Sequence, residues 1–287
     1  MRIRKLRVGL SVMLLACFGA VRLTWADPAE EAYNDGIRLL QAGQAREALT
    51  AFDKAIHLKP TYAEAYRKRG IVHHSLTQYD RAIKDYDETV HLNPDSSEIY
   101  YDRANAYSDS GQPERALKDY DTALRLNPRY AQAYYNRSLA HLTLDQGGEA
   151  AADARAYLNL KGWRESQAQY MVLVGYVANQ LAQHDVEARQ LLEEAKSKCD
   201  TAIWPYPIIR HLRHELTADD LLAAATDTDK QTEAQTYVGL DLSLSGHREE
   251  ALTYLRWVKD QGNKSFAEYT FATTALRRLE AAVQAQP

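Results

Sequence analysis

The chain has 287 residues, of which 45% are hydrophobic and 26% are charged, and these ordinary values exclude an intrinsically disordered or collagen-like chain. Residues 1–26 contain five basic residues and no acidic one, which leaves 30 basic against 39 acidic residues, a net charge of −9, for the rest. An acidic body argues against a nucleic-acid groove, because such grooves need clustered Lys and Arg to neutralise phosphates. Two cysteines are too few for a disulfide scaffold.

The first 26 residues have the pattern of an export signal. Residues 1–7 contain four positive charges and run into the uncharged stretch 8–21, which is shorter than the ~20 apolar residues that a membrane-spanning helix needs. Thr24 and Ala26 are small residues placed for signal cleavage after Ala26. We therefore expect residues 1–26 to be removed and the body to be exported to the periplasm or another extracytoplasmic space.

The same segment permits a second interpretation. Leu14 to Cys17 resembles a bacterial lipobox, in which the thiol of Cys17 would be lipidated and would anchor the protein. The residues after Cys17 stay apolar up to Val21, whereas a lipoprotein usually turns polar there. Both interpretations send the body across a membrane. After cleavage at Ala26, Cys199 is the only cysteine left, and we expect it to be a small buried side chain.

A 34-residue period organises the following part of the chain. Pro60, Pro94 and Pro128 are 34 residues apart, and each ends a similar phrase. Counting back from them defines four units at 29–62, 63–96, 97–130 and 131–164. Position 20 is alanine in every unit (Ala48, Ala82, Ala116 and Ala150). Positions 20, 24 and 27 share one face of a helix, as do positions 4, 7, 8 and 11, so each unit predicts two amphipathic helices joined by a short turn.

These units resemble the tetratricopeptide repeat (TPR) family, whose 34-residue pattern has defined aromatic and small positions in two helices. The third unit matches the pattern most fully, with Tyr100, Ala104, Tyr107, Ala116, Tyr120, Ala123 and Pro128. The resemblance implies an all-α solenoid of antiparallel helix pairs, with four TPR repeats over residues 29–164. Repeats 1 and 4 match less well, as expected for the flanks of a stacked array.

Residues 165–287 are predicted to be a degenerate TPR-like helical region. Gly175 and Ala188 fit a fifth unit with one extra residue between its helices, and Gly239 and Leu255 fit a sixth. The match to the repeat pattern is weaker in these two units than in the four repeats.

An insertion around residues 204–231 separates these two units. Its Trp204 to Pro207 stretch is expected to break any helix, since two prolines remove two hydrogen-bond donors. Thr217 starts a short helix that runs through Ala225. Residues 266–282 predict a solitary C-terminal capping helix that covers the last apolar face.

Three repeats share a pair of charged positions. Repeats 2, 3 and 4 have Arg at position 7 and Asp at position 23, and repeat 1 has neither. Because the two residues are present or absent together, the sequence predicts ion pairs that join the two helices of each repeat: Arg69 with Asp85, Arg103 with Asp119, and Arg137 with Asp153.

The sequence shows no catalytic constellation and no cofactor motif, so we expect the protein not to be an enzyme. His211, His214 and Glu215 come nearest to a metal site, but no third ligand is identifiable and a solvated helix face is expected instead. His73 occupies a packed position and is expected to be a hydrogen-bonded core residue. An enzyme with an unrecognised site in residues 165–231 and a structural subunit of an envelope complex remain open as alternatives.

The predicted binding surface is the concave face of the first helices of repeats 2 to 4. In the TPR family, positions 2, 5, 9, 12 and 13 of each repeat line a groove that holds extended peptides or a partner's helix. Tyr101 is the central candidate, with Arg67 and Tyr135 one repeat away on either side. Asn105 lies one turn farther along and would grip a peptide backbone. The same face includes Ser108, Asp109, Leu139, Leu142 and Thr143.

The order of signal, four repeats, insertion, later repeat and closing helix resembles the new lipoprotein I family of bacterial periplasmic adaptors. Local similarity lies in ATDTDKQTEAQTYVGL and NKSFAEYTFATTALRRLE. The resemblance implies a homodimeric scaffold that gathers cell-envelope proteases or peptidoglycan hydrolases. The sequence therefore predicts an exported interaction scaffold, or adaptor, that binds other proteins or extended peptides and no nucleic acid.

Overall fold

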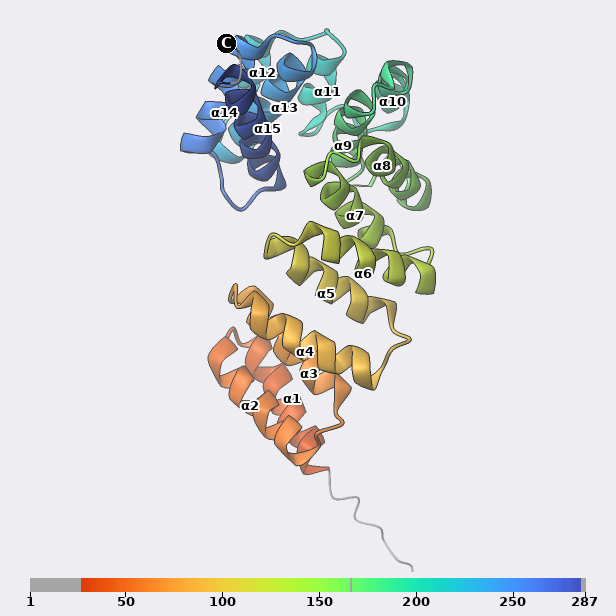
Figure 1. The fold of residues 1–287 in the computed structure, drawn as a ribbon, viewed down its shortest axis with the longest axis vertical. Helices are drawn as coiled ribbons and strands as arrows, with labels where there is room; N and C mark the ends of the chain where they lie inside the picture. Colours follow the sequence, from red (N-terminus) through yellow and green to blue (C-terminus); the bar gives the residue numbers. More distant parts are fainter. Residues whose placement is uncertain (1–26, 166, 285–287) are drawn as a thin grey trace, which may run out of the picture.

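The computed structural model describes residues 27–165 and 167–284, and all regular secondary structure in these two ranges is helical, as the all-α prediction requires. The helices are α1 (Pro28–Gln41), α2 (Ala45–Leu58), α3 (Ala63–Ser75), α4 (Tyr79–Leu92), α5 (Ser97–Asp109), α6 (Pro113–Leu126), α7 (Ala131–Thr143), α8 (Gly147–Lys161), α9 (Ala168–Leu181), α10 (Asp185–Lys198), α11 (Tyr206–Leu212), α12 (Ala218–Ala224), α13 (Thr228–Leu244), α14 (Arg248–Gln261) and α15 (Ala267–Gln284). They stack into an elongated solenoid with α1 at one end (Figure 1). The predicted export signal, including Cys17, lies outside the described residues.

None of the helices in the described ranges is both long enough and apolar enough to cross a membrane.

Each of the first four helix pairs turns at the same repeat position. Gly43 and Gly111 have φ angles of 75° and 76°, and Thr77 and Asp145 adopt the same left-handed conformation with φ of 57° and 59°. The next residue then donates its backbone N–H to a carbonyl five residues back, as Gln112 does to Tyr107 at 2.8 Å. This turn closes the first helix and reverses the chain. Glycine adopts the conformation at little cost, whereas the β-branched Thr77 does so with strain.

Small residues let the two helices of a pair approach closely. A Cβ atom on Gly70 would lie 2.8 Å from the ring of Tyr86, and one on Gly36 would lie 2.5 Å from Phe52. The aromatic ring of each second helix therefore occupies the space that a larger side chain on the first helix would fill. This contact explains why the repeat pattern pairs a small residue at position 8 with an aromatic residue at position 24.

The insertion differs from its prediction at one point. The Trp204 to Pro207 stretch does not prevent a helix, because α11 begins inside it at Tyr206. Pro207 lies in the first turn, where its missing N–H would have no intrahelical partner in any case. The short helix α12 is capped as expected, with the Oγ1 atom of Thr217 accepting from the backbone N–H of Asp220 at 3.1 Å.

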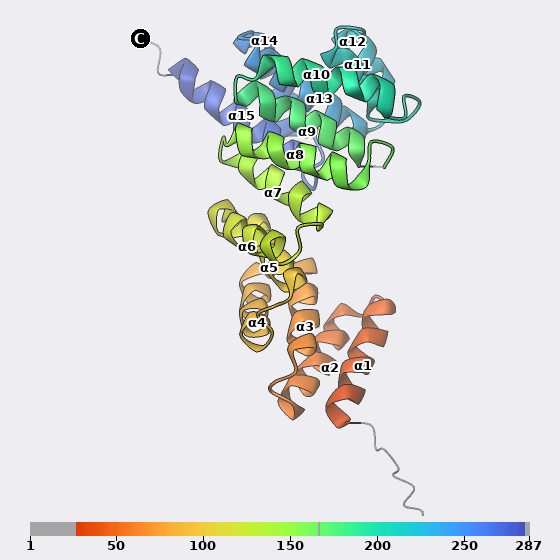
Figure 2. The ribbon, with the colours of Figure 1, turned by 90° about the vertical axis from the view of Figure 1, so that its right-hand side faces the viewer.

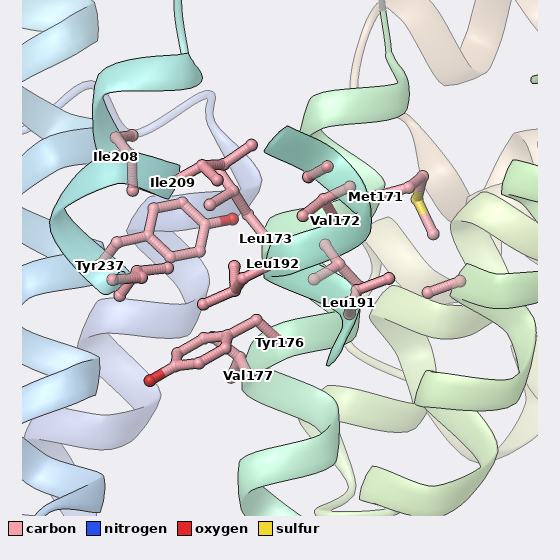
Figure 3. Packing of buried hydrophobic residues seen from close by; sticks show 14 of the residues in the cluster. Met171, Val172, Leu173, Tyr176, Val177, Leu191, Leu192, Ile208, Ile209 and Tyr237 are labelled. Atoms are coloured by element: carbon pink, nitrogen blue, oxygen red, sulfur yellow. The ribbon is translucent and has the colours of Figure 1, made fainter. Parts of the chain in front are cut away.

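The largest hydrophobic cluster lies in the C-terminal half of the solenoid and extends from α7 to α13. Figure 3 shows Ile208 and Ile209 of α11 and Tyr237 of α13 facing Leu173 and Tyr176 of α9. These contacts fold the chain back, so that α13 packs beside α9. The closing helix α15 packs on α13 and α14 as a cap, and it also reaches α7 (Figure 2). Helix α15 is thus placed beside the fourth repeat as well as over the last apolar face.

Candidate functional site

Arginine clasps hold the repeats that form the concave face. In repeat 3 the guanidinium of Arg103 donates to both carboxylate oxygens of Asp119, at 2.7 and 2.8 Å, and also to Asp87 of the preceding repeat, at 2.7 Å. The same arrangement joins Arg69 to Asp85 and Asp53, and Arg137 to Asp153 and Asp121. The predicted pairs within repeats are confirmed.

The bond to the preceding repeat was not predicted from the sequence. Its signal is an Asp at position 25 of repeats 1, 2 and 3, namely Asp53, Asp87 and Asp121. One planar guanidinium therefore connects the two helices of its own repeat and also binds the second helix of the preceding repeat. This fixes how successive concave helices lie against each other.

The histidines do not form a metal site. Within residues 27–165 and 167–284, no group of three or more His, Cys, Asp or Glu side chains could hold a metal ion. His211 instead pairs through Nδ1 with the backbone oxygen of Leu216 at 2.9 Å. His73 is buried and pairs with the side-chain oxygen of Gln78 at 2.8 Å, which confirms its prediction as a hydrogen-bonded core residue.

Tyr101 and Asn105 of α5, the predicted centre of the concave face, lie together and share a hydrogen-bond partner. The side-chain amide of Asn136, on α7, donates to the hydroxyl of Tyr101 at 3.0 Å and to Oδ1 of Asn105 at 2.8 Å. The hydroxyl of Tyr120 also donates to Oδ1 of Asn105, at 2.7 Å. Burial raises the pKa of Tyr101, so its hydroxyl stays neutral at physiological pH. The two predicted contacts thus belong to one network between α5 and α7.

Arg67 forms a cross-link between neighbouring repeats. Its Nε donates to Asp102 at 2.7 Å and its Nη1 to Glu98 at 2.8 Å, both on α5. Burial raises the pKa of Asp102, although the positive charge of Arg67 opposes that effect. The guanidinium therefore already has two carboxylate partners before any ligand arrives.

Tyr135 lies against the C-terminal helices. Its ring packs edge-on against Tyr157, with 5.9 Å between the ring centroids, and it adjoins the large core cluster. Burial, and then the carboxylate of Glu268 on α15, raise its pKa. Tyr135 therefore has a more enclosed environment than Tyr101, the candidate one repeat earlier.

A buried carboxylate lies where the insertion meets α9 and α13. Glu233 is only 5% exposed, and it accepts hydrogen bonds from Nε1 of Trp204 at 2.5 Å and from the hydroxyl of Tyr170 at 3.2 Å. Burial raises the pKa of Glu233 to about 7, with a further contribution from the nearby Glu268. Nothing in the sequence distinguishes Glu233 from a solvated helix residue, and this cluster was missed.

A cleft of about 860 Å³ lies between the repeats and the segment that leads into α15, together with α15 itself. Ser108, Asp109, Leu139 and Thr143 line it on the repeat side. The opposite wall comes from the last part of the chain and includes Lys264, Phe266, Phe271, Thr274 and Arg277. Four of the predicted groove positions therefore lie in this cleft. Arg67, Tyr101, Asn105 and Tyr135 do not line it.

An apolar cavity of about 310 Å³ adjoins the cleft. It shares Thr143, Phe271, Thr274 and Arg278 with the cleft, so the two spaces form one composite site. Its apolar wall includes Leu142, Val177, Leu240 and Leu279. The residues from α15 were expected only to cap the fold. A signal for their second role is the spacing of Phe271, Thr274 and Arg278, which places them on one helix face.

Comparison with known proteins agrees with the repeat geometry. The tetratricopeptide repeat family model matches residues 97–130, and a TPR repeat model matches residues 36–77. No curated protein matches the chain.

Solved structures share the fold at low sequence identity. A tetratricopeptide repeat protein from Parabacteroides merdae is 15% identical, covers 87% of this chain and 99% of its own, and has a TM-score of 0.61. YrrB, described as a TPR protein with an unusual peptide-binding site, is 18% identical, with coverages of 66% and 93% and a TM-score of 0.55. MamA from Desulfovibrio magneticus RS-1 is 20% identical, with coverages of 60% and 94% and a TM-score of 0.54. Residues 36–77 and 97–130 thus match tetratricopeptide repeats, and the solved structures show that the chain has the fold of a TPR solenoid.

Proposed function

We propose that the protein is an exported protein–protein interaction scaffold that binds an extended segment of a cell-envelope partner along the concave face of repeats 2 to 4. The observation that carries the proposal is the continuity of this face, from the Tyr101 and Asn105 network into the cleft beside α15. Tyr101 and Asn105 are half-buried side chains of α5, and Ser108 and Asp109 at the end of the same helix line the cleft. The peptide-binding site named for YrrB, a protein of the same fold, supports an extended occupant.

The groove is suited to a flexible partner because it is already held in shape. The arginine clasps and the network around Asn136 fix α3, α5 and α7 before binding, so little further ordering is required of the protein. Tyr101 supplies a rigid aromatic contact and Asn105 an amide that matches peptide groups. Arg67 and Tyr135 flank this centre by one repeat on each side. Export rests on residues 1–26, and envelope proteases or peptidoglycan hydrolases are the proposed partners.

The test begins with affinity capture from the native cell envelope, followed by mass spectrometry. The captured partner's affinity is then measured for the double variant Tyr101→Ala and Asn105→Ala, and for Lys118→Ala as a control on the exposed side of α6. We expect the double variant to weaken binding by about 5- to 30-fold, equivalent to about 1–2 kcal/mol, and the control to leave it unchanged.

Circular dichroism first establishes that both variants remain folded. Equal affinity of the double variant and the native protein would show that the central groove is not the binding surface. N-terminal analysis of the mature protein tests export separately. Asp27 as the first residue supports the cleaved soluble form, lipidated Cys17 supports the anchored form, and an intact Met1 rules out processing.

A further inference from the structure

The composite site beside α15 has an excess of positive charge on a protein whose body is acidic. Among the described residues that line the cleft and the cavity, four are cationic, namely Arg248, Lys264, Arg277 and Arg278, and one, Asp109, has a carboxylate. Asp109 is already paired with His74 at 2.9 Å, and Arg278 is paired with Asp145. Among the described residues, Arg248, Lys264 and Arg277 have no ion-pair partner. Three exposed positive charges are thus available to a ligand.

The apolar cavity lies directly beside these charges. Arg248 and Arg278 line it together with the side chains of Leu142, Val177 and Leu279. Among the described residues that line the cavity, none has a carboxylate. A concave apolar space with a few polar groups at its edge is the usual form of a pocket that receives one large apolar group.

The shape of the cleft favours an extended occupant over a compact one. The cleft continues from the cavity past Asp109 to Tyr79 and Pro113, which belong to α4 and α6. It therefore passes the turns between the two helices of repeats 2 and 3, as well as α7 of repeat 4. A small organic acid would fill the cavity and leave most of this length empty, whereas a peptide segment would occupy both.

We propose that the composite site binds an acidic segment of a partner protein, with its carboxylates beside Lys264, Arg277 and Arg248 and one large apolar side chain in the cavity. This inference rests on the proposed scaffold function and adds the chemistry of the segment that is bound. The exposed cations select for negative charge and speed association, while each such pair contributes little by itself. The buried apolar side chain supplies most of the affinity.

The test measures binding of short fluorescein-labelled peptides to the full mature protein by fluorescence anisotropy. The probe alternates Glu or Asp with Leu and contains one Phe. One control peptide replaces every acidic residue by Lys, and a second replaces Leu and Phe by Ser. We expect the probe alone to bind, and its affinity to fall as salt is added, because salt screens exposed charges.

Protein variants separate the two parts of the site. Lys264→Ala combined with Arg277→Ala removes two unpaired cations, and Thr274→Phe fills the cavity, with Ser243→Leu as a second filling variant. Lys259→Ala is the matched control, an exposed lysine of α14 that lines neither the cleft nor the cavity. We expect the double variant and the filling variants each to weaken probe binding by at least about fivefold, and the control to leave it unchanged.

Several results would overturn this inference. They are equal binding of the Lys peptide, unchanged affinity in the double variant, displacement of the probe by palmitate through competition for the cavity, or a dimer that covers the cleft in sedimentation experiments. A captured partner that depends on Tyr101 and Asn105, but not on Lys264, Arg277 or Thr274, would reject this inference and leave the proposed function intact. The reverse dependence would support this site and reject the central groove.

Discussion

The three arginine clasps are the residue-scale feature that distinguishes repeats 2 to 4 from the other helix pairs. Asp119 is 6% exposed, and the side chain of Arg103 is 16% exposed. Removing one partner of such a pair destabilises the fold, because the other charge is left uncompensated in a poorly solvated place. Arg103 also bonds to the exposed Asp87, so part of its charge stays compensated after the loss of Asp119.

We expect Asp119→Ala to lower the free energy of unfolding by about 2–3 kcal/mol, somewhat below the range for fully buried pairs because Asp87 remains. Lys118→Ala is the matched control, since Lys118 is the exposed neighbour on the same helix and lacks an ion-pair partner among the described residues. Urea denaturation of both variants measures the difference. Equal loss of stability in the two variants would contradict a structural role for the clasp.

Glu233 offers a second residue-scale test, through pH. Its pKa is raised from 4.5 to about 7 by burial, with Glu268 of α15 and Asp229 of its own helix acting in the same direction. Hydrogen bonds from Trp204 and Tyr170 act in the opposite direction. The folded state therefore binds a proton more tightly than the unfolded chain does. Stability is accordingly greatest below about pH 4.5 as far as this group is concerned, and falls as the pH rises to about 7.

We expect Glu233→Gln to be more stable than the native protein above pH 7, by up to about 3 kcal/mol, and to flatten the fall in stability with pH. Glutamine keeps the size of the side chain, and it can accept from Trp204 while donating to Tyr170. Thermal melts at several pH values between about 5 and 8 measure the slope, with the exposed Glu249→Gln as control. If the stability of Glu233→Gln fell with pH as steeply as that of the native protein, the carboxylate of Glu233 would not titrate in that range.

At the scale of helices, structural features that recur in successive repeats could be predicted from the sequence, whereas features that occur once in the chain could not. The positions of Gly70 and Tyr86, and of Arg103 and Asp119, recur every 34 residues, so the helix pairs and their internal ion pairs could be predicted without a structure. The helix start at Tyr206 could not, because the effect of Pro207 depends on whether it falls in a first turn or an interior turn.

The docking of α15 shows the same limit for the candidate site. Its amphipathic pattern predicts that one face is buried, and Ala272, Leu276 and Leu279 do pack against buried residues of α14. Its approach to α7 depends on the path of the chain through α11 to α14, which leaves no periodic signal. The cleft between Leu139 and Phe271 arises from that long-range contact. For this reason the wall formed by residues 264–278 was absent from the predicted groove.

Across the whole molecule, the core is divided unequally. The first three repeats have smaller separate clusters rich in alanine, which include Phe52 with Ala48 and Tyr120 with Ala116. From α7 to α13, one continuous cluster joins several helices, and Met171, Leu173 and Ile208 are fully buried in it. In a repeat array, stability depends on each unit and its neighbours, so these two parts need not unfold together.

We therefore expect hydrogen exchange to divide the full chain into a less protected part, α1 to α6, and a more protected part centred on α9 and α13. Within the part of the chain that the structure describes, the pair α1 and α2 contacts one neighbouring pair, through α2 and α3, and should exchange first. A tenfold or greater difference in opening equilibrium between α2 and α9, about 1.4 kcal/mol, is the expected minimum. Mass spectrometry of exchange at increasing urea concentration resolves the two parts. Loss of protection in all helices at the same urea concentration would contradict this division. It would mean that the repeats and the C-terminal cluster unfold as one cooperative unit.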